Sequence, residues 1–167
     1  KRLRMYKKVN IGLNVKTFNS DYFCSKKIIG KYKLDKVKII CLDPSCSGSG
    51  MKNRLNDYSE YSNLSLKEAV IQISKKRSQK DKIRLKQLSA FQFKMIAYSI
   101  QTFPNLEYIV YSTCSINNEE NENIVEHVIE RFPKITLINL FEGNWEQRGF
   151  SIKKNITDNS VLTNTIR

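Results

Sequence analysis

The 167-residue chain is strongly basic, with a formal net charge of +13 at pH 7, and 40% of its residues are hydrophobic. This length and apolar content suit a single domain with a hydrophobic core. No apolar run approaches the roughly 18 residues of a membrane span, and residues 1–5 lack the apolar core of a signal peptide. We therefore expect a soluble intracellular protein.

The first half of the chain predicts few regular elements. Residues 1–9 have the character of a helix end, and residues 14–18 of a short strand leading to Asp21. Residues 36–42 predict a buried strand. The pattern fails over residues 53–82, which are rich in Ser, Asn, Lys and Tyr. We expect a basic, partly mobile, low-complexity insertion there, with a short ordered piece at residues 64–73.

The second half alternates between helix and strand. A helix is predicted over residues 83–103, ending before Pro104, and a strand over 106–112. The next helix can be capped by Asn117 or Asn118, and a last strand is predicted over residues 135–140. The apolar positions of the two helices are Leu85, Leu88, Phe91, Met95, Ile96 and Ile100, then Ile124, Val125, Val128, Ile129 and Phe132. This alternation predicts an α/β fold with a parallel sheet.

Two polar turns follow predicted strands of this sheet. One is Asp43-Pro-Ser-Cys46 and the other Tyr111-Ser-Thr-Cys-Ser115. In an open parallel sheet, sites form outside the carboxyl ends of the strands. We therefore expect Cys46 and Cys114 to meet at one edge of the sheet.

An acid and two thiols together suit methylation of a pyrimidine at carbon 5. A thiolate that adds to carbon 6 makes carbon 5 nucleophilic toward a methyl donor. A carboxylic acid such as Asp43 can stabilise the charge that builds on the ring near N3. A second thiol can assist when the enzyme is eliminated, so Cys46 and Cys114 can divide these two roles.

The remaining cysteines and the single histidine suggest no further chemistry. No two cysteines stand at C-x-x-C spacing, so we expect neither a zinc site nor disulfides. We expect Cys24 and Cys41 to be buried thiols and His127 to lie on a helix surface.

A helix N-terminus after Cys114 would lower the pKa of its thiol, whereas Glu119 and Glu120 would raise it. The sequence leaves the net sign open.

Other cysteine and phosphate chemistries fail at named positions. A cysteine phosphatase needs Cys-x5-Arg, but that spacing from Cys46 reaches Lys52, which lacks the fork that grips phosphate. A cysteine hydrolase needs a histidine base, which His127 would have to provide from a helix face. A phosphate loop needs adjacent Gly and Lys, and Met51 separates Gly50 from Lys52.

The two turns resemble signature blocks of the Sun-domain (Nop/Sun) RNA cytosine-5 methyltransferase family. The residues concerned are 42–51, LDPSCSGSGM, and 111–116, YSTCSI, followed by EENE at 119–122. The Pro-Ser-Cys and Ser-Gly-Ser-Gly-Met form is most similar to the branch that modifies large-subunit ribosomal RNA. The resemblance extends more weakly over residues 1–167.

The resemblance implies a Rossmann-like methyltransferase fold, with helices on both faces of a mostly parallel sheet, and S-adenosylmethionine as cofactor. Residues 1–167 would then be the C-terminal part of a catalytic domain, incomplete at both ends. It further implies that Cys114 is the nucleophile and Cys46 the release cysteine. Arg2, Asp21, Asp43 and Pro44 would contact the cofactor, Asp43 lying between its methionine end and the base.

The resemblance also implies ribosomal RNA as the partner and a nuclear, nucleolar location. The net positive charge agrees with a nucleic-acid partner, although a compositional bias toward Lys and Asn is an alternative explanation of the charge. Lysines of residues 53–82 are candidates for RNA contacts. A rival hypothesis is a basic RNA-binding fragment or subunit without catalysis, since the family's glycine-rich cofactor loop has no counterpart in residues 1–167.

Overall fold

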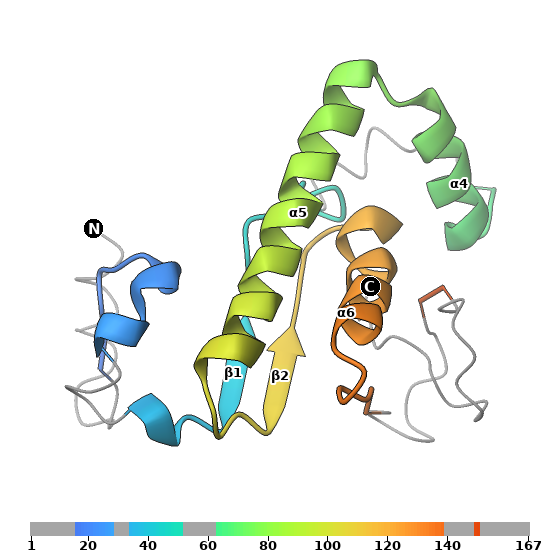
Figure 1. Ribbon diagram of the computed structural model, residues 1–167. Helices are drawn as coiled ribbons and strands as arrows, with labels where there is room; N and C mark the ends of the chain where they lie inside the picture. The colour runs from blue at the N-terminus through green and yellow to red at the C-terminus, as the bar shows by residue number, and fades with distance from the viewer. Residues whose placement is uncertain (1–15, 29–33, 52–62, 139–148, 151–167) are drawn as a thin grey trace.

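The computed structural model describes residues 16–28, 34–51, 63–138 and 149–150. Within these ranges a two-stranded parallel sheet packs against helices (Figure 1). Strand β1 spans Ile39–Leu42 and β2 spans Tyr108–Tyr111. The helices are α4 at Leu66–Lys76, α5 at Gln79–Thr102 and α6 at Glu122–Arg131. Short 3-10 turns lie at Tyr22–Cys24, Leu34–Lys36 and Asn118–Glu120.

The strand register places both carboxyl ends at the same level. Ile39 pairs with Tyr108, and Leu42 pairs with Tyr111. The Ser112 amide also donates to the Leu42 carbonyl at 2.9 Å, which extends the pairing by one step. The prediction that these two strands are parallel neighbours is confirmed.

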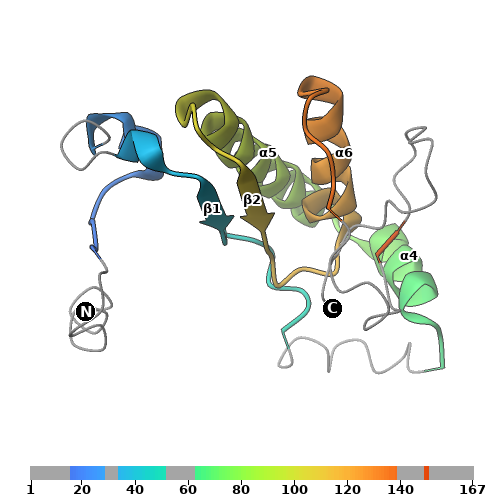
Figure 2. The same ribbon diagram turned by 90° about the horizontal axis from the view of Figure 1, so that it is seen from below.

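Helices α5 and α6 cover one face of the sheet (Figure 2). Side chains on that face form the core with apolar residues of the two helices. Its buried members are Ile40, Leu42, Ile96, Phe103, Ile124 and Val128. The opposite face carries Ile39 and Val110, which are 58% and 48% exposed. Helices on both faces are thus not seen in the described ranges and stay a prediction.

Several element boundaries differ from the sequence prediction. The expected insertion at residues 53–82 contains α4 and the first turn of α5. The helix that corresponds to the short ordered piece expected at residues 64–73 spans Leu66–Lys76. Ser65 starts α4 with a reciprocal capping box involving Glu68, and Ser78 caps α5. These two caps explain why a polar segment forms helices.

The predictions of a strand at residues 135–140 and of one at 14–18 are wrong for their described parts, because residues 135–138 and 16–18 have no strand structure. Asn117 and Asn118 do not start the α-helix. The chain first makes a 3-10 turn, and α6 begins at Glu122. The predicted helix end at residues 1–9 lies outside the described residues.

Burial also differs at particular positions. Phe91, expected on the buried face of its helix, is 41% exposed, whereas Gln92 and Ser99 are fully buried. Cys41 is exposed on the sheet face opposite α5 and α6, so its assignment as a buried thiol is wrong, and Cys24 is half-buried. His127 is exposed on α6, as predicted. None of the helices in the described ranges combines the length and apolar character needed to cross a bilayer.

We expect Ile124→Ala to destabilise the fold, because this side chain is 1% exposed in the core. Truncating such a residue costs about 2–5 kcal/mol. Urea unfolding would measure the free energy. Ile83→Ala is the matched control, since Ile83 is 51% exposed on α5; equal losses for both variants would contradict this packing.

Candidate active site at the sheet edge

The structure brings Cys46 and Cys114 together. Their sulfur atoms lie 3.1 Å apart, although the residues are 68 positions apart in sequence. Cys46 follows β1 and is half-buried, whereas Cys114 follows β2 and is exposed. The predicted meeting of the two thiols is confirmed, and the pairing of the strands explains it.

A backbone hydrogen bond joins the two cysteine turns, which we define as residues 43–51 and 112–117. The Gly50 amide donates to the Cys114 carbonyl at 2.9 Å. A Cβ atom at Gly50 would lie only 3.1 Å from that carbonyl oxygen and 3.4 Å from the Ile116 side chain. Glycine therefore permits this close approach. Gly48 has a φ of 68°, a conformation that disfavours other residues.

Three serine hydroxyls form a second link between the cysteine turns. The Oγ atoms of Ser47, Ser49 and Ser115 lie 3.2 Å from one another. The Ile116 amide donates to Ser49 Oγ at 3.0 Å. Ser47 to Gly50 is thus bonded to the second turn rather than being only a flexible connection.

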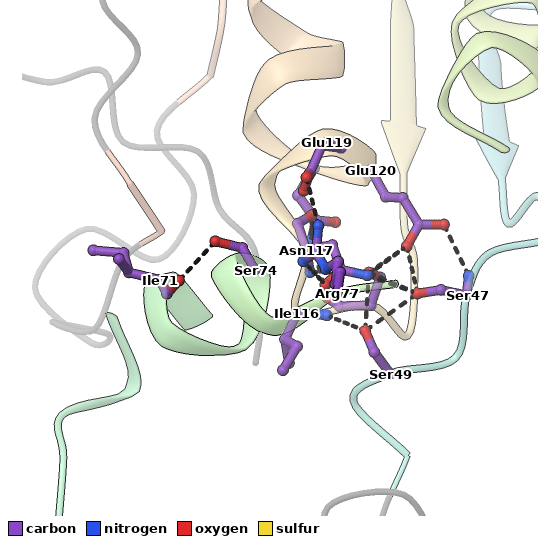
Figure 3. A network of polar contacts seen from close by, with 11 residues as sticks. Ser47, Ser49, Ile71, Ser74, Arg77, Ile116, Asn117, Glu119 and Glu120 are labelled. Carbon is purple, nitrogen blue, oxygen red and sulfur yellow. Dashed lines mark hydrogen bonds and ion pairs between the residues drawn. The ribbon is translucent and has the colours of Figure 1, made fainter. Parts of the chain in front are cut away.

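The carboxylate of Glu120 lies at the centre of this polar network (Figure 3). It is fully buried and accepts hydrogen bonds from Ser47, Ser115, Gln92 and Asn117. Burial alone would raise its pKa, but the hydrogen bonds from Ser115, Ser47 and Gln92 outweigh that effect and lower it. Glu120 is therefore a buried anion at neutral pH.

Arg77 connects the junction of α4 and α5 to the second cysteine turn. Its guanidinium donates to Glu119 at 2.5 Å and to Asn117 Oδ1 at 2.6 Å, and its side chain is 11% exposed. Asn117 in turn donates to Ser47 Oγ at 3.0 Å. The junction of α4 and α5 is thus anchored to the second cysteine turn, and Figure 3 shows Arg77 beside Asn117 and Glu119.

The electrostatic surroundings of Cys114 favour its protonated form. The pKa of the Cys114 thiol is raised first by its hydrogen bond with the Cys46 sulfur and then by desolvation. Electrostatic repulsion from Cys46 and Asp43 raises it further. This settles the sign that the sequence left open. The thiolate is the minor form at neutral pH, so deprotonation has to accompany any nucleophilic attack.

The predicted cofactor residues lie in two places. Asp43 is exposed and Pro44 is buried directly after β1. Asp21 borders a pocket of about 330 Å³ lined mostly by apolar side chains, and its Oδ1 accepts from the Phe23 amide at 3.0 Å. A mostly apolar pocket with a carboxylate among its lining residues has the chemistry that an adenine ring requires. Arg2 lies outside the described residues.

Sequence analysis missed the polar residues that hold the site together: Arg77, Gln92, Asn117 and Glu120. The sequence suggests an effect of Glu120 on the Cys114 pKa and places it in the EENE block, but it does not predict a structural role for this residue. The local sequence does not predict its burial, because two of its partners, Gln92 and Ser47, come from segments 28 and 73 positions away. No group of three or more His, Cys, Asp or Glu side chains suited to a metal occurs in the part of the chain that the structure describes.

Two thiols at the carboxyl ends of neighbouring parallel strands define an α/β protein with a cysteine-based site at its sheet edge. Over residues 1–160 the chain matches the family described as 16S rRNA methyltransferase RsmB/F, and it belongs to that family. The family resemblance predicted from the two turns is confirmed.

Curated relatives include methyltransferases of large-subunit ribosomal RNA. The 28S rRNA (cytosine-C(5))-methyltransferase of Drosophila melanogaster is 32% identical over 74% of this chain and 25% of the relative. The 25S rRNA (cytosine-C(5))-methyltransferase NSUN5 of Arabidopsis thaliana is 35% identical over 70% of this chain and 19% of the relative. The 25S rRNA (cytosine-C(5))-methyltransferase rcm1 of Schizosaccharomyces pombe is 36% identical over 66% of this chain and 21% of the relative.

The chain therefore spans about a quarter or less of the length of these relatives. No solved structure matches it significantly. The predicted likeness to the large-subunit branch agrees with the names of these relatives.

We expect Cys46→Ala to lower the pKa of Cys114, because contact with the Cys46 sulfur is the largest cause that raises it. The pH midpoint for alkylation of Cys114 by iodoacetamide, followed by peptide mass spectrometry, should move down. Cys24→Ala should leave the midpoint unchanged. An unaltered midpoint in Cys46→Ala would show that the thiol contact does not control the titration.

Proposed function

We propose that this protein is part of an RNA (cytosine-5) methyltransferase that acts on large-subunit ribosomal RNA with S-adenosylmethionine as methyl donor. The observation that carries the proposal is the pair of sulfur atoms 3.1 Å apart at the carboxyl ends of two parallel strands. Family membership and the names of the relatives support it.

In the proposed reaction Cys114 is the nucleophile, as the family resemblance implies; in support, Cys114 is an exposed residue whereas Cys46 is half-buried. After the thiol has lost its proton to solvent, its sulfur forms a bond to carbon 6 of cytosine as the double bond between carbons 5 and 6 opens. Carbon 5 would then be able to accept the methyl group that S-adenosylmethionine supplies when bound. The proton on carbon 5 is lost next, and the bond between sulfur and carbon 6 breaks as the ring double bond re-forms. Cys46 lies within hydrogen-bond distance of the Cys114 sulfur, which suits a role in this elimination.

Asp43 is the proposed acid that stabilises charge on the ring. It is exposed, directly after β1, so it can meet a base that enters from solvent. A carboxyl group that shares a proton with the ring near N3 lowers the barrier to attack at carbon 6.

S-adenosylmethionine supplies the activated methyl group when bound. We propose that Asp21 and its apolar pocket accept the adenine and that Asp43 and Pro44 border the methionine end. Arg2 is proposed to contact the cofactor, as the family resemblance implies. The complete fold is proposed to be Rossmann-like, with helices on both sheet faces.

RNA is proposed to bind along α4 and the first half of α5. The exposed basic side chains of this region are Lys67, Lys75, Lys76, Lys80, Lys82, Arg84 and Lys86. Arg77 fixes the helix junction to the turn that carries Cys114. Phosphates bound to these helices would therefore have a fixed relation to the reactive thiol.

We also propose a nucleolar location, since large-subunit ribosomal RNA is made there and relatives named for 25S and 28S RNA come from eukaryotes. Microscopy of the fluorescently tagged protein tests this. A cytoplasmic signal without nucleolar enrichment would refute it.

The two thiols should have separable roles. Cys114→Ala should abolish both methylation and any covalent RNA adduct, because no bond to carbon 6 can form. Cys46→Ala should allow attack and methyl transfer but slow elimination, so an adduct stable to denaturation should accumulate. Denaturing gels of the full chain with cytosine-containing RNA and S-adenosylmethionine would measure both.

Cys24→Ala is the matched control and should behave as the unsubstituted protein. An adduct formed by Cys114→Ala but not by Cys46→Ala would reverse the assignment of roles. RNA binding without methylation or adduct in any form of the protein would favour the non-catalytic RNA-binding hypothesis.

Replacement of Lys75, Lys80 and Lys82 by Gln should weaken RNA binding and flatten its salt dependence. Each lost phosphate contact removes roughly 0.7 from the logarithmic slope on single strands, so the triple variant should lose about 2. Filter binding at several salt concentrations would measure this. The matched control replaces the exposed residues Lys26, Lys27 and Lys134; equal effects in both variants would indicate attraction by net charge alone.

A further inference from the structure

We propose that Glu120 is a positioning residue that holds the two cysteine turns at reacting distance. The effect of Glu120 on methylation rests on the proposed function. Its effect on the distance between the two thiols does not depend on that function. Neither thiol is bonded to Glu120 itself, so it would act through the turns that carry them.

The contacts of Glu120 join three parts of the chain. From the first cysteine turn, the Ser47 amide donates to Oε1 at 2.8 Å and its hydroxyl donates to Oε2 at 2.5 Å. From the second, Ser115 Oγ donates to Oε2 at 2.5 Å. From α5, Gln92 Nε2 donates to Oε1 at 3.1 Å. One side chain thus binds the residue after Cys46 and the residue after Cys114.

The backbone of Glu120 is also fixed relative to the sheet. The Tyr111 hydroxyl, at the end of β2, donates to the Glu120 carbonyl at 2.6 Å. Gln92 donates as well to the Ser45 carbonyl at 3.0 Å, one residue before Cys46. The carboxylate therefore holds both turns from a position defined by β2 and α5.

The charge of Glu120 matters in addition to its shape. Its two oxygens accept five hydrogen bonds from described groups. A glutamine of the same size would direct an NH2 group at some of these donors and leave buried donors unpaired. Glu120→Gln should consequently loosen the turns while the apolar core, formed by other residues, stays intact.

The geometric test is oxidation of the Cys46–Cys114 pair by diamide. Two thiols then lose two protons and two electrons to form a disulfide, and the azo reagent is reduced to the hydrazine. Mass spectrometry of peptides from the full chain would give the rate. We expect it to fall at least tenfold in Glu120→Gln and Glu120→Ala relative to the unsubstituted protein.

Glu119→Gln is the matched control. Glu119 is the preceding residue, but its side chain is 40% exposed and pairs with Arg77 rather than with Ser47 or Ser115. The cross-linking rate of Glu119→Gln should stay within twofold of the rate of the unsubstituted protein. If Glu120→Gln melts cooperatively and cross-links as fast as Glu119→Gln, the positioning role is refuted.

Should both Glu120 variants fail to fold, Ser47→Ala and Ser115→Ala give a graded test, because each removes hydrogen bonds to the carboxylate. Each single variant should slow cross-linking, and the double variant should slow it further. Unchanged rates in all three would equally overturn the proposal.

The catalytic consequence is measured separately. Glu120→Gln should lower kcat for methylation at least tenfold with little change in KM for RNA, since alignment of the sulfurs affects the chemical steps rather than binding. Cross-linking requires neither RNA nor cofactor. Slow cross-linking in the Glu120 variants, together with no methylation by any form of the protein, would therefore contradict the proposed function and leave the positioning role supported.

Discussion

The parallel register of β1 and β2 is the constraint on which the site depends. Because Leu42 pairs with Tyr111, both strands end at the same level, and the turns that follow start side by side. Parallel strands require a long crossover connection, and here α4 and α5 lie within it. The chain thus travels far from Cys46 and returns at Cys114 to the same edge of the sheet.

The register alone does not fix the distance between two polar turns, because turns have few apolar contacts to hold them. The site solves this with buried polar groups. A carboxylate in such a place costs several kcal/mol in desolvation, and the hydrogen bonds that Glu120 accepts offset this cost. Loss of one partner would leave a buried charge or donor unpaired, so the network favours a single arrangement of the two turns.

The sequence predicts the parts of the site that depend on local pattern. The apolar runs before Asp43 and before Cys114 predict strands at residues 36–42 and 106–112. The parallel topology of these strands then brings the cysteines together. The same reasoning fails where tertiary contacts decide. Asn is a residue type that commonly caps helices, but the side chain of Asn117 binds Arg77 and Glu120 instead. Gln92 stands on the buried face of α5, where its NH2 group donates to the Ser45 carbonyl and to Glu120.

The division between exposed thiol and buried support has a chemical consequence. In the proposed reaction Cys114 has to be exposed to reach a base, and exposure leaves its position to be set by neighbours rather than by its own packing. Its raised pKa means that the attacking thiolate is scarce before substrate binds. The proposed reaction would therefore depend on alignment of the sulfur, since a thiolate that forms only transiently can react only if it already faces carbon 6. A buried carboxylate bonded to both cysteine turns would provide that alignment.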